Sequence, residues 1–271
     1  MKKALDKMFK RVLFISDTHC GHEYGLTPPE WWYGVESGDE SVQKVSRFQR
    51  ELWNFFCDAV ATILPVDILV VNGDAIDGKG DKSGGTEQYT SKWKEQCRMA
   101  ARVIDEVKAP KVRLLYGTRY HTGKEDDFEG FIPDMINCGD VDVEGHGFYT
   151  INGVKFDVKH KINSSSIPHG RMTALARAQL WNRIWHSEHE RQPLSDVLVR
   201  SHVHYHNHCG GPGWLAMTCP ALSYNTSFGI RECEGVVDVG MIVFDVYEDG
   251  RYDWWPILAK FDALKVQSIL L

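Results

Sequence analysis

The alternation of short apolar runs with longer helical patterns most constrains what this chain can fold into. Residues 12–15, 67–71 and 111–116 are apolar and rich in β-branched side chains, which is typical of strands covered on both faces. Between these runs, residues 41–64 and 90–107 repeat apolar side chains at helical spacing, and a proline ends the first helix. Strands that alternate with helices predict βαβ units and a layered α/β fold.

The second half of the chain predicts more strands and one further helix. Residues 147–158 form two strands around an Asn-Gly pair, which is the strongest short signal for a hairpin. Residues 168–191 have a helical pattern, and residues 196–200 form a short strand. Residues 236–246 and 251–255 predict a closing hairpin around an Asp-Gly turn.

Length and charge limit the function classes. The chain has 271 residues, and because α/β domains of this size are common as single units we expect one domain over residues 1–271. The formal net charge of −6 argues against tight, sequence-independent binding of long duplex DNA, which needs a dense Lys and Arg footprint. A nuclease is still compatible with this charge, because bound metal ions add local positive charge.

Cysteine usage and hydropathy indicate the compartment. The seven cysteines are odd in number and show no repeated C-x-x-C spacing, so we interpret them as reduced thiols of an intracellular protein. No stretch approaches the roughly 20 apolar residues of a membrane span. We therefore expect a cytoplasmic protein with no membrane partner.

Acidic and imidazole side chains gather where the predicted strands end. In chain order the residues concerned are Asp17, His19, Asp74, Asp77, Thr118, Arg119, His121, His160, His202 and His204. Sites in open α/β sheets form at the carboxyl ends of strands, so these side chains are expected to converge. Carboxylate and imidazole ligands together suit Mn, Fe, Zn or Ni better than Ca. One Asp can bridge two ions, and two ions can clamp both reacting oxygens of a phosphoryl transfer.

Each cluster alone has an ordinary structural explanation. An Asp after a strand is often a helix N-cap, and Gly-Asp is often a simple turn. A lone histidine such as His160 is more often a satisfied or exposed side chain than a ligand. The set of clusters, each in the predicted strand-end context, favours a shared metal site.

The order of these motifs resembles that of the calcineurin-like metallophosphoesterases. The family has D-x-H, G-D-x-x-[DN], G-N-H-[DE], a single H and G-H-x-H, and the resemblance runs from Val12 to His204. It implies a four-layer αββα sandwich of two mixed β-sheets flanked by helices, and two divalent ions, Mn first with Fe, Zn, Ni or Mg as alternatives. The implied ligands are Asp17, His19 and His204 for one ion, Asp74 between the ions, and His160 and His202 for the other. Asp77 is expected to orient its neighbours through hydrogen bonds.

The third motif departs from the family pattern. Thr118 stands where the family has its ligand Asn, and Arg119 stands where it has His. His121 can supply the missing ligand or the missing acid, Thr118 is a weaker metal ligand, and Arg119 can grip a phosphate with its planar fork. The alternative is that His121 is an ordinary loop residue beside a weak second site. This Gly-Thr-x-x-His form resembles a variant branch that includes phage and prophage members, whose location would be the host cytoplasm.

The resemblance implies hydrolysis of a phosphate ester by direct attack of a hydroxide that bridges the two ions. His121 is the best candidate to protonate the leaving oxygen. We expect a phosphodiester substrate, in a nucleotide or nucleic acid, although the family also includes monoesterases. The alternative is a degenerate member that binds metal as a non-catalytic binding protein.

Three other features allow two interpretations each. The basic run at Lys79, Lys82, Lys92 and Lys94 can meet a nucleic-acid backbone, but a solvated surface is more usual. The stripe of Leu180, Trp181 and Trp185 predicts a core face, with a dimer face as the alternative, so the oligomeric state stays open. Trp31 and Trp32 can line a substrate pocket or simply pack their loop onto the body.

Overall fold

A computed structural model of the chain describes residues 8–32, 45–80, 85–122, 127–165, 167–225 and 237–261. Its first sheet has six strands in the order β11-β10-β1-β2-β3-β4. They are β1 (Phe9–Ile15), β2 (Ile68–Asn72), β3 (Lys111–Leu115), β4 (Asp140–Glu144), β10 (Gly240–Tyr247) and β11 (Tyr252–Leu258). β1 to β4 are parallel, whereas β10 pairs antiparallel with both β1 and β11. The first sheet is therefore mixed.

The second sheet has five strands in the order β5-β6-β7-β9-β8. They are β5 (Gly147–Ile151), β6 (Val154–Lys161), β7 (Val197–Ser201), β8 (Asn207–Gly211) and β9 (Trp214–Thr218). β6, β7 and β9 are parallel, and the edge strands β5 and β8 are antiparallel to their neighbours.

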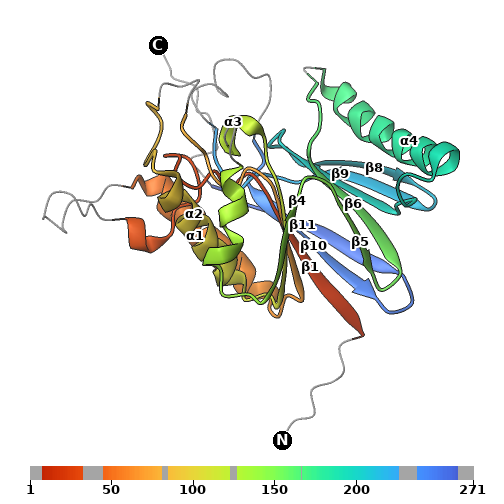
Figure 1. Ribbon diagram of the computed structural model, residues 1–271, viewed down its shortest axis with the longest axis horizontal. Helices are drawn as coiled ribbons and strands as arrows, with labels where there is room; N and C mark the ends of the chain where they lie inside the picture. The colour runs from red at the N-terminus through yellow and green to blue at the C-terminus, as the bar shows by residue number, and fades with distance from the viewer. Residues whose placement is uncertain are drawn as a thin grey trace, which may run out of the picture.

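Helices cover the outer face of each sheet, as Figure 1 shows. The helices are α1 (Arg47–Ile63), α2 (Trp93–Val107), the short α3 (Arg119–Thr122) and α4 (Arg171–His189), with single 3-10 turns at η1 (Pro29–Trp31), η2 (Phe128–Phe131), η3 (Pro133–Met135) and η4 (Pro168–Gly170). α1 and α2 lie against the first sheet and α4 against the second. The expected αββα sandwich of two mixed sheets is confirmed.

The apolar run of β1 shows why the central strands do not alternate apolar with polar side chains. Leu13 and Ile15 pack with α1 and α2 in one buried cluster, whereas Val12 and Phe14 pack against the second sheet in another. Phe14 contacts the ring of Phe156 on β6 at a centroid distance of 5.9 Å. Because both faces of the first sheet are buried, a continuous apolar run was the correct signal for its central strands.

Several element boundaries differ from those expected. α1 begins at Arg47, because the Ser46 hydroxyl accepts from the Gln49 N–H and Gln49 bonds back to Ser46, which forms a capping box. Residues 41–44, where the sequence predicted its start, lie outside the described residues. α2 begins at Trp93, three residues late, and η4 precedes α4 within the predicted helix. β4, β8 and β9 were not predicted.

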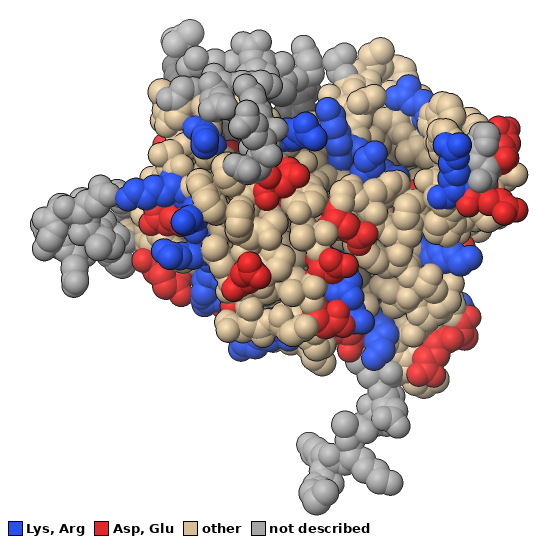
Figure 2. Space-filling view, in the orientation of Figure 1, with Lys and Arg blue, Asp and Glu red and all other residues tan. Residues whose placement is uncertain are grey.

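The surface and the aromatic loop complete the fold. Figure 2 shows Lys, Arg, Asp and Glu interspersed over much of the visible face. Trp31 and Trp32 pack against the helix-side core, and their indole N–H groups bond to Glu95 and to the Thr27 carbonyl. The packing interpretation therefore holds for these two residues. Among the described residues, no helix is long and apolar enough to cross a bilayer.

Candidate metal centre

The predicted ligands sit on loops with an unusual backbone. Five of them have positive φ although none is glycine: Asp17, His19, Asp74, His202 and His204, with φ between 41° and 74°. This conformation is costly for residues with a side chain, and it is found where the surrounding structure fixes it, often at functional sites. The loops after β1, β2 and β7 are therefore shaped to aim these side chains.

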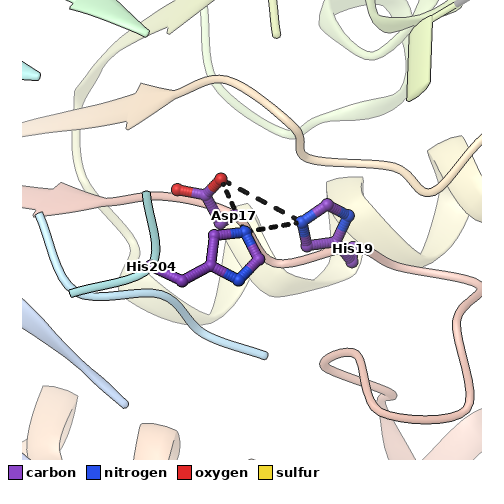
Figure 3. A group of neighbouring side chains, drawn as sticks. All are labelled: Asp17, His19 and His204. Atoms are coloured by element: carbon purple, nitrogen blue, oxygen red, sulfur yellow. Dashed lines mark hydrogen bonds and ion pairs between the residues drawn. The ribbon is translucent and has the colours of Figure 1, made fainter. Parts of the chain in front are cut away.

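The first ligand group consists of Asp17, His19 and His204 (Figure 3). His204 Nε2 lies 3.2 Å from both Asp17 Oδ1 and His19 Nε2, and His19 Nε2 lies 4.0 Å from Asp17 Oδ1. Asp17 and His19 follow β1, while His204 follows β7 in the other sheet. Three donor atoms from two sheets thus face one point.

The second group consists of Asp74, His160 and His202. Asp74 Oδ2 lies 3.0 Å from His160 Nε2 and 3.9 Å from His202 Nδ1. His160 lies inside β6, which continues to Lys161 through an irregular register, and not at the strand end that the sequence predicted. Its ring still points at Asp74.

A third group joins the first two. His19, Asp74 and His121 also bring donor atoms together, so His19 is shared with the first group and Asp74 with the second. The His121 ring lies 4.4 Å from the His19 ring, centroid to centroid. Asp74 therefore belongs to two of the three groups, and His19 links one of these to the group of Asp17 and His204.

Two buried donor atoms test whether the site fits a metal. Asp17 Oδ1 and His160 Nε2 are buried and make no well-aligned hydrogen bond among the described residues, although His204 Nε2 lies 3.2 Å from the first and Asp74 Oδ2 3.0 Å from the second. Their other atoms are occupied: Asp17 Oδ2 accepts from the Ser16 hydroxyl at 2.5 Å, and His160 Nδ1 lies 2.6 Å from the Asn72 carbonyl. Buried polar atoms are rarely left without a good hydrogen bond, so these two atoms, which face other candidate ligand atoms and not a hydrogen-bond partner of good geometry, fit cation binding.

The carboxylates and most of the histidines of the cluster stabilise one another's charged forms. Burial opposes ionisation of Asp17 and Asp74, but nearby histidines outweigh it and lower the pKa of both carboxyls. Burial likewise opposes charging of His160, yet Asp74 and Asp17 raise its pKa to about 10. His19 differs, because burial and the charge of His121 lower its pKa to about 4. The carboxylates are thus ionised at neutral pH and attract positive charge.

The residues of the third motif lie beside Asp74 in different roles. The Thr118 N–H donates to Asp74 Oδ1 at 2.6 Å, and the Thr118 hydroxyl lies 3.2 Å from the same oxygen. Thr118 therefore orients the carboxylate. The Arg119 side chain is exposed.

Asp77 lies beside the ring nitrogens of His19 and His121. Its Oδ1 lies 3.4 Å from His19 Nδ1 and 3.3 Å from His121 Nδ1, and it belongs to none of the ligand groups. His121 Nδ1 also lies 2.9 Å from the Asp77 carbonyl oxygen. Against the cost of burial, Asp74 and Asp77 raise the pKa of His121 to about 9.

Sequence reasoning missed two supporting residues. Glu129 is buried and accepts from the Ala75 N–H at 2.5 Å and the Gly117 N–H at 2.7 Å, which ties the loop after β2 to the loop after β3. Asn72 donates to the Ser201 hydroxyl at 2.6 Å and so links the ends of β2 and β7. Asn72 directly precedes the Gly-Asp pair of the second motif and was detectable, whereas nothing in the spacing marks Glu129.

His206 extends the His-x-His pattern without joining the cluster. Its Nδ1 lies 2.9 Å from the Thr218 carbonyl, and its ring lies 5.9 Å from that of His208. Neither histidine belongs to a ligand group within the described part of the chain.

Comparisons with known proteins give structural similarity only. No family model matches the sequence, and no curated protein matches it. Among solved structures, the chain is similar to an archaeal phosphodiesterase at 12% identity and a TM-score of 0.46, covering 91% of this chain and 99% of that one. It is similar to vacuolar protein sorting 29 from Cryptosporidium parvum at 10% identity and a TM-score of 0.45, covering 94% and 100%. A predicted phosphoesterase from Streptococcus pneumoniae matches at 11% identity and a TM-score of 0.35, covering 92% and 98%.

Proposed function

We propose that this protein is a metal-dependent phosphoesterase that hydrolyses phosphodiesters with two divalent ions, Mn²⁺ foremost. The observation that carries the proposal is the linked arrangement of ligand groups. Asp17, His19 and His204 would hold one ion, and His160 and His202 the other. Asp74 would serve both ions, and its grouping with His160 and His202 on one side and with His19 and His121 on the other supports this role. Two ions, when bound, would lower the pKa of water and stabilise the charge of a phosphate in transfer.

The chain's own residues have distinct tasks in this proposal. Asp77 orients His19 and His121 through its carboxylate. His121, mostly buried beside His19, is proposed to donate a proton to the leaving oxygen, with service as a metal ligand as its alternative role. Arg119, exposed on α3, is proposed to contact the phosphate, since its guanidinium matches phosphate oxygens in pairs.

The rival is a protein that binds metal and catalyses nothing. Structural metal sites are usually closed by four protein ligands, whereas catalytic sites keep a position for water or substrate. Each ligand group of the described residues offers three donor side chains. His204 in one group and His202 in another are only partly buried. This open arrangement favours the enzyme.

The test is hydrolysis of bis(p-nitrophenyl) phosphate and p-nitrophenyl phosphate by metal-stripped and Mn²⁺-loaded protein. We expect Mn²⁺-dependent cleavage, faster with the diester, and a loss of at least a hundredfold in kcat/KM in Asp74→Asn. Asp58→Asn, an exposed α1 carboxylate remote in sequence from the motifs, is the matched control and should retain activity. Metal uptake without cleavage of either ester would support the non-catalytic rival. Manganese as the metal and a cytoplasmic location stay predictions.

A further inference from the structure

A groove of about 850 Å³ lies beside α4 on the outer face of the second sheet. α4 packs on β7, β8 and β9, and the groove opens next to it over β6. Side chains on a strand alternate between faces. His160 therefore points to Asp74 between the sheets, while its neighbours Lys159 and Lys161 line the groove on the other side.

The groove is positively charged. Lys159, Lys161 and Arg177 line it, and none of the three has an acidic partner within ion-pair distance among the described residues. The one acidic side chain of the lining, Asp157, is already neutralised, because Arg200 and His146 each lie 2.8 Å from its Oδ1. In Figure 2, the upper right of the visible face, where Figure 1 places α4, carries several Lys and Arg side chains, with Asp and Glu side chains at its outer edge. In a chain of net charge −6, such a cluster concentrates positive potential at one place and attracts a polyanion.

Two tryptophans form one wall of the groove. Trp181 and Trp185 lie one turn apart on α4, with ring centroids 6.2 Å apart and planes inclined by 29°. Trp181 is 52% exposed, and Leu180 beside it is 57% exposed, so the core interpretation of this stripe is wrong. Exposed large aromatic side chains at a groove mark a binding surface. Base rings stack on such side chains with little dependence on sequence.

We infer that this groove binds single-stranded nucleic acid. Lys159, Lys161 and Arg177 contact phosphates, and Trp181 stacks with a base. The Trp185 ring, over which the Arg191 guanidinium lies at 5.6 Å, supports the Trp181 ring from behind. A duplex keeps its base faces covered, and an acidic peptide without aromatic side chains has no ring to stack, so a single strand fits both features of the groove. The inference deepens the proposed function. It rests on that function for the claim that the bound strand is the substrate.

The position of the groove agrees with that role. Ile162 and Asn163, which follow the end of β6, line the groove and lie within three residues of His160. A strand held beside α4 therefore reaches the edge of the sheet at which the ligand groups lie. The basic run predicted from sequence is less suited, since Lys79 and Lys94 lie over the rings of Phe128 and Trp93, and Lys82 lies outside the described residues.

The test is fluorescence anisotropy of a labelled oligothymidylate of about twelve nucleotides with the full chain in EDTA, where no hydrolysis occurs. Lys159→Glu, Arg177→Glu and Trp181→Ala should each weaken binding about tenfold. The slope of log K against log salt should fall by about 0.7 for each cation removed. Lys155→Glu, on the same face of β6 but outside the groove lining, and Leu180→Ala, beside Trp181, are matched controls and should bind within twofold of wild type.

Thermal denaturation of each variant separates lost binding from lost folding. Equal binding by groove variants and controls would overturn the inference, as would equal affinity for a duplex or equal competition by a polyglutamate peptide. Hydrolysis of the small diester without oligonucleotide binding would refute the groove and leave the proposed function standing. Groove-dependent binding without diester hydrolysis would refute the proposed function and leave the groove as a binding site for single strands.

Discussion

Asp74 is held at the residue scale by close backbone contacts as well as by histidines. The Thr118 N–H donates to its Oδ1, and His160 Nε2 lies 3.0 Å from its Oδ2. Gly117 approaches so closely that a Cβ built there would lie 2.0 Å from Asp74 Oδ1. The space for the shared carboxylate therefore depends on a residue that carries no side chain.

Replacement of Gly117 by Ala should displace Asp74 and weaken metal binding. We expect Mn²⁺ affinity by calorimetry to fall at least tenfold, because a new methyl group and the carboxylate cannot occupy the same position. Gly145→Ala is the matched control, since a Cβ at Gly145 meets nothing within 4 Å. Unchanged affinity in Gly117→Ala would show that Asp74 has room to move and is not held for a metal.

Residue types and order predicted the side chains that converge, but not everything that supports them. Asp17 and His204 come from different sheets, and the order of strand-end motifs was enough to place them together. Glu129 escaped notice because its role depends on two backbone N–H groups, Ala75 and Gly117, whose positions exist only in the folded chain. A buried carboxylate of this kind leaves no spacing pattern in the sequence.

At the scale of elements, β6 and β7 are joined by a buried charge network under α4. Asp157 on β6 lies 2.8 Å from Arg200 on β7 and 2.8 Å from His146, and Asn182 of α4 lies within 3.4 Å. Burial opposes ionisation of Asp157, but His146 and Arg200 outweigh it and lower its pKa. The network connects the second sheet to its covering helix.

This network predicts a pH-dependent stability. Because the pKa of Asp157 is lower in the folded chain than the ordinary 3.8, its stabilising contribution is complete above that value and is lost as pH falls through the folded pKa. Asp157→Asn should lower the free energy of unfolding at pH 7 by about 3 kcal/mol, since it leaves Arg200 without its buried partner.

Urea denaturation of wild type and Asp157→Asn at pH 7 and pH 3 measures the effect. The difference in unfolding free energy between the two proteins should narrow at pH 3. A difference of the same size at both values of pH would mean that Asp157 acts through packing and not through its charge.

Element prediction succeeded where patterns were long or doubly buried. β1, β2, β3 and α1 were recognised from apolar runs and helical spacing. β8 was missed, because Asn207–Gly211 is a polar, glycine-containing edge strand with low intrinsic strand propensity. Its pairing with β9 holds it in the extended conformation. β4 was missed for a similar reason, since Asp140–Glu144 alternates with exposed acids at the edge of the first sheet.

At the scale of the whole molecule, the two sheets bring their loops to one edge while their outer faces stay separate. The first sheet and the second contribute to both principal ligand groups, so the centre depends on the packing between sheets. The layered fold followed from the alternation of elements and from the resemblance in motif order. The groove beside α4 could not be predicted from the sequence, because its charge and its exposed tryptophans depend on which part of β6 the helix leaves uncovered.

The number of ions bound per chain tests the shared metal centre most directly. Metal-stripped protein is loaded with Mn²⁺, freed of excess ion by gel filtration, and analysed for metal content and by electron paramagnetic resonance. We predict two ions per chain with a spin-coupled signal, loss of at least one ion in Asp74→Asn, and full retention in Asp58→Asn. A single ion in the wild type, or two ions retained in Asp74→Asn, would contradict a centre built around Asp74.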